Sequence, residues 1–343
     1  MAGGAVLYSA AFCEHGSAEH VERPERARVI RATLARSPLE DGVAHIPPRS
    51  ATSAELTRVH PAAYIASLDA FCDKGGGWID ADTYLSPRSA DIARQAAGAA
   101  AQAVEAVMSG ERRWAFSICR PPGHHATPTM AMGFCLVNNA AVAARHAQVA
   151  LGARRVLIID WDVHHGNGTQ DAFYDDGSVL YFSVHQSPLY PGTGRVEERG
   201  TGEGRGATLN VPLRAGCSDD DYTYVFQQAL RPVARAFAPD LVIVSAGFDA
   251  HTRDPLGQMH VSTEGFAKLA SITREIAEET PAAGRLVGLL EGGYDLEGLA
   301  ASALAVMQTW DADRPLTPST TRVDPHGVDA RTREVVARVT AGG

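Results

Sequence analysis

The sequence predicts an α/β fold in which one parallel β-sheet lies between two layers of helices. Short apolar, β-branched segments alternate with longer alanine-rich segments of helical character along the chain, and no internal repeat or low-complexity linker divides it. Continuous apolar strands that alternate with helices are typical of parallel sheets buried on both faces. A length of 343 residues and a hydrophobic content of 45% suffice for one large core.

The predicted elements follow from this alternation. The apolar runs predict strands at Ala5–Ser9, Trp114–Cys119, Val156–Asp160, Val179–Val184, Leu241–Ser245 and Leu286–Leu290. The segments between them predict helices near Pro24–Ala35, Ser53–Phe71, Ser89–Met108, Leu136–Val149, Asp219–Ala236, Thr263–Glu279 and Leu296–Trp310. The polar, proline-bearing end predicts a main domain over residues 1–310 and a C-terminal tail or arm over residues 311–343 that packs on it.

Charge and composition exclude several classes of protein. The net charge of −9 argues against a nucleic-acid platform, which needs clustered cations. No apolar run approaches the ~20 residues of a membrane span, and the N-terminal segment lacks the basic residues of a secretory signal. Five widely spaced cysteines without a C-x-x-C pair suit a reducing compartment. We therefore expect a cytoplasmic protein without a membrane or nucleic-acid partner.

An unusual polar cluster follows almost every predicted strand. The clusters are Arg-Pro-Pro-Gly-His-His at 120–125, Asp-Trp-Asp-Val-His-His-Gly-Asn-Gly at 160–168, Ser-Val-His at 183–185, Ala-Gly-Phe-Asp at 246–249 and Glu-Gly-Gly-Tyr at 291–294. In open α/β sheets, ligands bind beyond the carboxyl ends of the strands. Several clusters at such ends predict one crevice, and with it an enzyme.

One of these clusters has the spacing of a metal site. In an extended segment, residues two apart point to the same side, so Asp160, Asp162 and His164 could face one point, and Asp249 could meet them from another strand. Two carboxylates and an imidazole suit zinc or another divalent first-row metal. Three protein ligands and an open position are typical of catalytic zinc sites. The alternative is that each residue only caps a turn.

The remaining clusters carry groups suited to proton transfer and charge stabilisation. Two adjacent histidines, His124 and His125, indicate proton transfer near neutral pH. Tyr294 follows two glycines that let the backbone turn tightly, and its phenol could donate to an oxyanion forming on a carbonyl.

Six segments together resemble the zinc-dependent histone deacetylase family. They are R-P-P-G-H-H-A at 120–126, G-F-C at 133–135, D-W-D-V-H-H-G-N-G at 160–168, P-G-T-G at 191–194, A-G-F-D-A at 246–250 and E-G-G-Y at 291–294, in order between about Glu19 and about Ala305. Within the family the chain is similar to the class II branch and to bacterial histone deacetylase-like amidohydrolases and acetylpolyamine amidohydrolases. The resemblance implies a single-domain, arginase/deacetylase-like fold and hydrolysis of an acyl amide.

The resemblance also implies two metal ions. One zinc per chain would be held by Asp162, His164 and Asp249. A monovalent cation, usually potassium in this family, would lie near Asp160, Asp162, the carbonyl of His164 and Ser183.

The implied catalytic groups are the tandem histidines and the tyrosine. His125 would act as the general base and His124 would give electrostatic support, with Asp160 bonded to the far ring nitrogen of His124. Tyr294 would polarise the acyl carbonyl. Asn167 stands where other branches of the family carry an aspartate as partner of the second histidine. A neutral amide orients His125 without a charge that raises its pKa.

Further residues are implied around the substrate. Gly133 would accept the substrate amide N–H through its carbonyl, while Phe134 and Tyr190 would line a narrow tunnel. Arg26 matches an arginine on the product-exit channel. The entry motif usually has proline after its histidine, whereas this chain has Val21 there, which we interpret as a backbone variation without consequence.

The substrate is less well defined by the sequence. Polyamine-selective relatives can carry a glutamate at the position of Leu256, so leucine favours acetyl-lysine in a peptide or protein. Bacterial polyamine enzymes use carboxylates from other loops and a dimer-closed site, and Asp80 and Asp82 are candidates for such a loop. Acetylated polyamines therefore stay open as substrates, and so does a homo-oligomer.

Two more distant alternatives remain. A ureohydrolase of the arginase type would need extra bridging aspartates for a second metal, and Asn167 and the single Asp249 argue against them. A non-catalytic acyl-lysine binding protein would be indicated by loss of Tyr294 or of a metal ligand, and none is lost.

Overall fold

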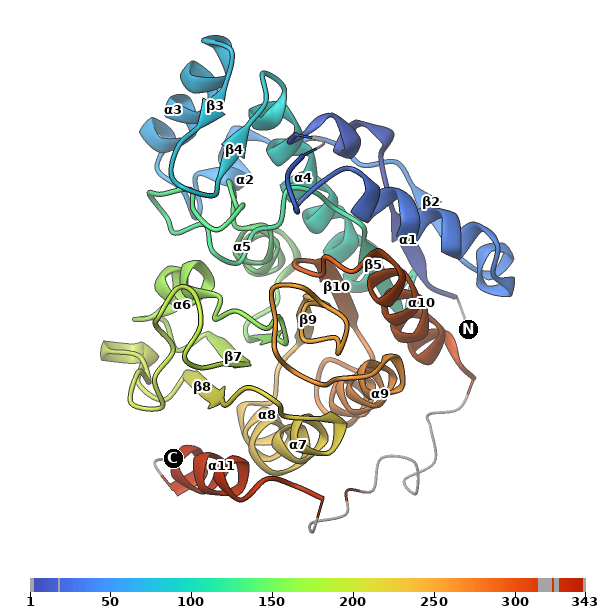
Figure 1. The fold of residues 1–343 in the computed structure, drawn as a ribbon, viewed down its shortest axis with the longest axis vertical. Coiled ribbons are helices and arrows are strands. Elements are labelled where there is room, and N and C mark those ends of the chain that lie inside the picture. Colours follow the sequence, from blue (N-terminus) through green and yellow to red (C-terminus); the bar gives the residue numbers. More distant parts are fainter. Residues whose placement is uncertain (1–2, 18, 314–322, 324–326, 342–343) are drawn as a thin grey trace.

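The computed structural model describes residues 3–17, 19–313, 323 and 327–341. Its centre is an eight-stranded sheet of order β2-β1-β5-β10-β9-β6-β7-β8, in which every paired neighbour is parallel. Helices cover both faces of this sheet (Figure 1). The predicted α/β class with a parallel sheet between two helical layers is confirmed.

Six strands correspond to the predicted ones: β1 (Ala5–Leu7), β5 (Trp114–Ser117), β6 (Val156–Asp160), β7 (Val179–Gln186), β9 (Leu241–Ala246) and β10 (Leu286–Leu290). The two edge strands, β2 (Ala44–Ile46) and β8 (Thr208–Leu213), were not predicted. Edge strands contact the sheet on one side only, so they need no continuous apolar run. His45 in β2, and Asn210 and Pro212 in β8, interrupt the apolar pattern.

Alternate residues of each strand enter two different hydrophobic cores. In β6, Val156 and Ile158 pack with α4 (Ser89–Met108) and α5 (Asn139–Leu151). The next residues along, Leu157 and Ile159, belong to the core that α1 (Glu25–Ala35), α9 (Thr263–Glu279) and α10 (Leu296–Asp311) cover on the other face. This period-two alternation fixes which side chains at the ends of the strands point into the site.

Three predicted helices differ in detail. The helix expected at 53–71 is two helices, α2 (Ser53–Leu56) and α3 (Ala62–Asp73), because Pro61 precedes the second and cannot continue the first. The helix expected at 219–236 comprises α7 (Asp219–Val225), a π-helical turn at Phe226–Leu230 and α8 (Arg231–Phe237). The helix expected from Leu136 begins later, since Asn138 caps α5.

Shorter elements complete the described fold. The helix α6 (Asn167–Phe173) follows the metal-site segment, and a two-stranded hairpin pairs β3 (Gly77–Trp78) with β4 (Tyr84–Leu85). Three 3₁₀ turns lie at Ala10–Glu14, Pro38–Gly42 and Gly202–Gly204. The hairpin lies with α3 at one end of the molecule (Figure 1).

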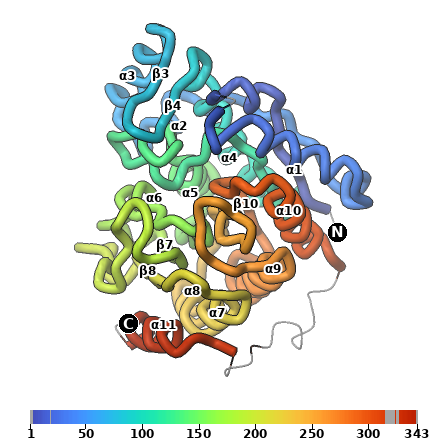
Figure 2. Tube along the Cα trace, viewed as in Figure 1, coloured from blue at the N-terminus to red at the C-terminus, as the bar shows by residue number. Residues whose placement is uncertain are grey.

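The last helix, α11 (Ala330–Ala341), lies against β8 and beside α7 (Figure 2). Val336 and Val339 of α11 are buried in the core of that side. The predicted division of the chain after residue 310 stays a prediction. Among the described residues, no helix combines the length and the hydropathy needed to cross a membrane.

The cap of α5 supports a prediction about stability. Asn138 is fully buried, accepts a hydrogen bond from Ala141 N at 2.9 Å and donates to Ala126 O at 3.2 Å. Asn138→Ala removes the cap and leaves the carbonyl unpaired, so we expect about 2 kcal/mol less free energy of unfolding. Denaturant unfolding measures this, with Val149→Ala, an exposed change on the same helix, as a control expected to cost less than ~0.5 kcal/mol. Equal stability of the two variants would contradict the prediction.

Candidate active site

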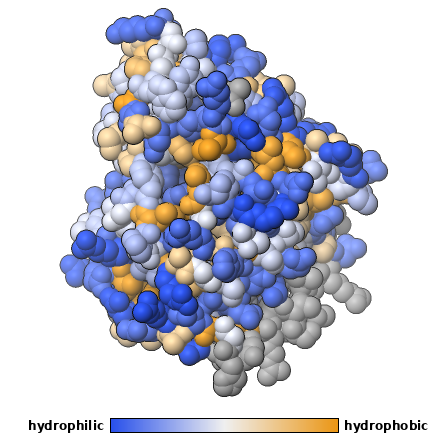
Figure 3. All heavy atoms as spheres, in the orientation of Figure 1, coloured by the Kyte–Doolittle hydropathy of each residue, from blue (hydrophilic) through white to orange (hydrophobic). Residues whose placement is uncertain are grey.

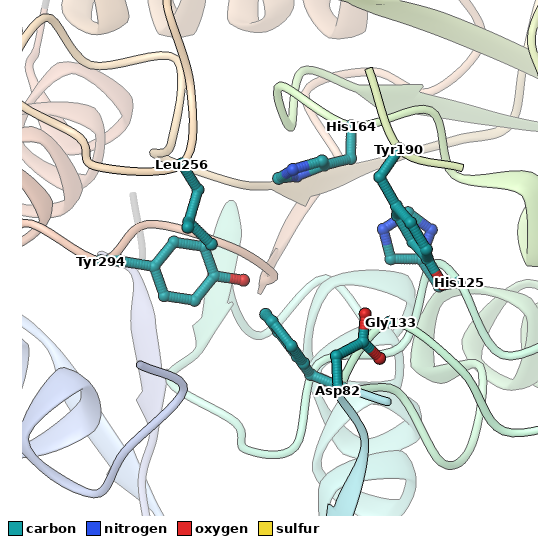
Figure 4. Close-up of a pocket in the computed structure, with 8 residues that line it drawn as sticks. Asp82, His125, Gly133, His164, Tyr190, Leu256 and Tyr294 are labelled. Carbon is teal, nitrogen blue, oxygen red and sulfur yellow. The ribbon is translucent and has the colours of Figure 1, made fainter. Parts of the chain in front are cut away.

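A narrow pocket lies at the carboxyl edge of the sheet. Its cavity of about 220 Å³ is smaller than the ~300–1,000 Å³ of sites for drug-sized ligands, which suits a slender chain. Figure 4 shows Tyr294 and Leu256 on one side of it and His125 and Tyr190 on the other, with His164 between them. The residues that line it are Asp82, His125, Gly133, Phe134, His164, Tyr190, Leu256 and Tyr294. Loops far apart in sequence thus meet in one crevice.

Three possible metal ligands converge at the floor of this pocket. Nδ1 of His164 lies 3.1 Å from Oδ1 of Asp162 and 3.1 Å from Oδ2 of Asp249. Each aspartate has its other oxygen fixed by a backbone N–H: Gly292 N donates to Asp162 at 2.7 Å and Val163 N to Asp249 at 2.8 Å. Both aspartates are fully buried. These bonds orient one oxygen of each carboxylate towards the imidazole.

This donor set fits a divalent cation. Ligand atoms at the 2.0–2.2 Å that zinc prefers stand roughly 3.4 Å apart in a tetrahedron, close to the separations observed here. The two buried carboxylates carry two negative charges when ionised, and a protonated His164 would supply only one positive charge. A divalent cation would balance both. Three ligands also leave one position for a substrate or water. The residues present therefore suit a catalytic zinc ion.

The tandem histidines have different partners. His125 donates from Nδ1 to Oδ1 of Asn167 at 2.8 Å, which leaves its Nε2 available in the neutral ring. His124 donates from Nδ1 to Oδ2 of Asp160 at 3.1 Å. Burial, together with the neighbouring His124 and His164, holds the pKa of His125 well below its usual value. Burial lowers the pKa of His124 too, but Asp162 and Asp160 outweigh it and raise that pKa well above its usual value.

Glu291 fixes the backbone of the tandem-histidine loop, a role that the sequence did not predict. Its fully buried carboxylate accepts hydrogen bonds from Gly123 N at 2.6 Å and His124 N at 3.1 Å, and from Ser245 Oγ at 3.1 Å. It thereby ties the histidine loop to the ends of β9 and β10. In the sequence, the signal for this role is an acidic residue that directly follows the apolar strand Leu286–Leu290.

Tyr294 is held by a buried arginine and an aspartate. The guanidinium of Arg26 lies 4.8 Å from the centre of the Tyr294 ring, and its Nε donates to Gly293 O at 2.6 Å. Arg26 is fully buried and pairs with Glu22 at 2.9 Å. Asp254 accepts from Tyr294 N at 2.6 Å. Burial raises the pKa of the Tyr294 phenol well above its usual value, against the opposing effect of Arg26, so the hydroxyl keeps its proton.

The pocket wall beside His125 requires a glycine. Gly133 has φ of +55°, and a Cβ there would lie 2.4 Å from Cδ2 of His125. Phe134 also has a positive φ, +68°, an uncommon conformation for a bulky residue. Strained backbone of this kind occurs at functional sites where the surrounding structure enforces it. Gly133 and Phe134 therefore form one part of the pocket wall in a conformation that the surrounding structure enforces.

Comparison with known proteins identifies the family. The histone deacetylase domain matches residues 20–310, most of the chain. The chain belongs to this family. Relatives include histone deacetylase 15 of Arabidopsis thaliana, with 43% identity over 86% of this chain and 53% of that protein, so the chain spans about half of its length. The histone deacetylase-like amidohydrolase of Pseudomonas aeruginosa is 42% identical over 85% of this chain and 77% of its own.

Two further relatives agree. A probable deacetylase of Methanothermobacter thermautotrophicus is 40% identical over 90% of this chain and 91% of its own. The crystal structure of the HDA15 HD domain superposes with a TM-score of 0.90 at 39% identity and covers 99% of this chain and 94% of its own. The predicted resemblance to the histone deacetylase family is confirmed.

The residues predicted to hold a monovalent cation lie next to the candidate zinc ligands. Asp160 and Ser183 are paired in register between β6 and β7. One carboxylate oxygen of Asp160 accepts from Asp162 N at 3.2 Å, and Tyr181 donates to the other at 2.9 Å. The hydroxyl of Ser183 bonds His185 at 2.9 Å. A cation at this point stays a prediction.

Another cluster of possible ligands already has a cationic partner. Glu55, Glu105 and His146 lie close enough together to hold a metal. Arg49 donates to Glu55 and to Glu105 at 2.7 Å each, so both carboxylates already have a cationic partner. This cluster joins α2, α4 and α5 as an ion-pair network, and we assign no metal to it.

The neutral partner of His125 supports a prediction about pH dependence. Asn167→Asp places a negative charge 2.8 Å from the ring, which favours the protonated imidazole and raises its pKa. A base that stays protonated to higher pH loses activity sooner on acidification, so the acidic limb of the kcat/KM profile should move upward. Asp171→Asn, a change of charge on the same helix, should leave that limb in place. An unchanged or downward limb in Asn167→Asp would contradict the assignment of His125.

Proposed function

We propose that this protein is a zinc-dependent amidohydrolase that removes the acetyl group from the side chain of acetyl-lysine in a peptide or protein. The observation that carries this proposal is that the candidate ligands and the candidate catalytic groups converge on one pocket. The ligand triad of Asp162, His164 and Asp249, the neutral ring of His125 and the protonated phenol of Tyr294 come from separate loops to one narrow pocket.

Zinc in this position would act as a Lewis acid on the acyl carbonyl and would make water nucleophilic at neutral pH. The residues of the chain would then orient the substrate. Tyr294 would donate its hydroxyl proton in a hydrogen bond to the carbonyl oxygen, and this bond would strengthen as negative charge develops there. The carbonyl of Gly133 would accept the amide N–H, which fixes the plane of the amide.

His125 would move the protons. Its Nε2 would remove a proton from the attacking water, because Asn167 holds the ring with Nδ1 protonated. As the carbon–nitrogen bond breaks, the same nitrogen would return that proton to the departing amine. Water thus adds across the amide, and acetate and a free amine leave. The positive charge favoured on His124 would stabilise the negative intermediate nearby.

The walls of the pocket favour an acetylated lysine. Phe134 and Tyr190 face a straight apolar chain, and Leu256 offers no charge to a distal amine. The rival substrate, an acetylated polyamine, is favoured by one observation: the carboxylate of Asp82 lines the pocket. Asp80 is less suited to binding a distal amine, because its carboxylate already accepts hydrogen bonds from Asp82 N, Thr83 N and the Thr83 hydroxyl.

The cytoplasmic location stays a prediction.

A comparison of rates tests this substrate. Zinc-loaded enzyme should hydrolyse an acetyl-lysine peptide with a kcat/KM at least tenfold above that for acetylputrescine and acetylspermidine, about 1.4 kcal/mol of discrimination. A polyamine preference of that size would replace the proposed substrate and point to Asp82. Absence of turnover on all three would overturn the hydrolase itself.

The phenol of Tyr294 supports a second prediction. Tyr294→Phe keeps the ring on Arg26 but removes the donor to the carbonyl oxygen, so kcat should fall by about a hundredfold or more. Zinc content and unfolding free energy should match the wild-type protein, which separates a lost donor from a damaged fold. Turnover near the wild-type level would defeat this role.

A further inference from the structure

One tryptophan of this protein lies outside the core, next to the pocket. Trp78 on the β3–β4 hairpin is 55% exposed, whereas Trp114, Trp161 and Trp310 are each at most 2% exposed. Figure 3 shows apolar residues across the middle of the face that is viewed in Figure 1, below the end of the molecule that carries the hairpin. Tryptophan is enriched at interaction surfaces, where its ring can contact an apolar group while its N–H stays in water.

A line of aromatic rings connects Trp78 with the pocket wall. Phe134, which lines the pocket, has its ring centre 4.8 Å from that of His20, and His20 in turn lies 5.6 Å from Trp78. Tyr84 packs edge-on against Trp78 at 5.3 Å. A substrate that leaves the pocket over Phe134 and continues past His20 would therefore reach Trp78.

Hydrogen bonds hold this rim in place. Phe134 N donates to the hydroxyl of Thr83 at 3.2 Å, which ties the hairpin loop to the pocket wall. His20 donates from Nε2 to the carbonyl of Asp82 at 3.0 Å. The hairpin, the His20 segment and the Phe134 loop thus form one connected unit. A surface that is already ordered loses little conformational entropy when it binds a partner.

The charge at this rim selects what the surface can bind. The carboxylate of Asp82 points towards the cavity (Figure 4), and burial raises its pKa. A nearby positive charge would offset that cost. The π face of an exposed tryptophan also attracts cations, and Arg in particular stacks on it. The carboxylate of Asp82 and the ring of Trp78 therefore both favour a cationic group.

We propose that Trp78, together with Asp82, binds the cationic side chain of an arginine or lysine that neighbours the acetyl-lysine in a peptide substrate. This proposal rests on the proposed function and adds a sequence preference to it. Trp78 would determine specificity and would take no part in the hydrolysis.

Matched peptides test the proposal by activity. Three peptides differ only in the residues that flank acetyl-lysine: arginine in the first, norleucine in the second and glutamate in the third. Wild-type enzyme should prefer the arginine peptide to the norleucine peptide by about tenfold in kcat/KM. Trp78→Leu, which keeps an apolar surface but removes the π face, should cut this preference to about threefold or less, whereas Trp78→Phe should keep most of it. Val149→Ala, an exposed change near the far end of α5, should keep the preference in full.

Two activity results would overturn the proposal. An equal loss on all three peptides in Trp78→Leu would mean that Trp78 only stabilises the hairpin. A norleucine or glutamate peptide preferred by the wild-type enzyme would mean that the rim does not select a cation.

Fluorescence gives a readout that needs no turnover. Because Trp78 is the exposed tryptophan and the other three are buried, acrylamide quenching reports mainly on Trp78. In zinc-loaded Tyr294→Phe protein, the arginine peptide should protect Trp78 from acrylamide more than the norleucine peptide does. Protection by acetylspermidine and not by the arginine peptide would overturn the proposal. Protection by the arginine peptide without any hydrolysis by wild-type enzyme would support this binding site while the proposed function fails.

Discussion

Buried negative charge at the carboxyl edge of the sheet is the constraint on which the rest of the site depends. Asp160, Asp162, Asp249 and Glu291 are all fully buried there. Leaving an ionised carboxylate in an apolar interior without compensation is very costly, so each must be paired or hydrogen-bonded. Backbone N–H groups of Gly123, His124, Val163 and Gly292 supply part of the compensation. Burial still raises the pKa of Asp160, and it raises the pKa of Asp249 and of Glu291 to about 7. A charged His124 and a zinc ion would favour the ionised carboxylates.

This arrangement explains why the loops at the strand ends have little freedom. Gly292 donates to the candidate metal ligand Asp162, and a Cβ at position 292 would lie 2.1 Å from Oδ2 of Asp249. Glu291, the preceding residue, fixes the loop of the tandem histidines. The following segment carries Tyr294, which Arg26 and Asp254 hold. One short segment after β10 thereby fixes the candidate metal ligands, the tandem histidines and Tyr294 relative to one another, which is the pre-organisation that charge stabilisation needs.

Much of this could be predicted from the sequence, because the apolar runs and the polar clusters after them are local patterns. The six internal strands are of this kind, and so is the convergence of Asp162, His164 and Asp249. The edge strands were missed, since Asn210 and Pro212 break the apolar run of β8. The split near Pro61 was missed because alanine-rich sequence on both sides has helical character. Glu291 and Asp254 act through backbone groups distant in sequence, and Trp78 gains its meaning only from its distance to His20; none of these relations has a local signature.

The most direct test of this account measures bound zinc and acetate release together. Protein stripped of metal should release no acetate from an acetyl-lysine peptide, and one zinc per chain should restore the full rate. Asp249→Asn should lose zinc binding and turnover in parallel, because it removes one of the three converging ligands. Full turnover by metal-free protein, or unchanged zinc affinity in Asp249→Asn, would contradict the account.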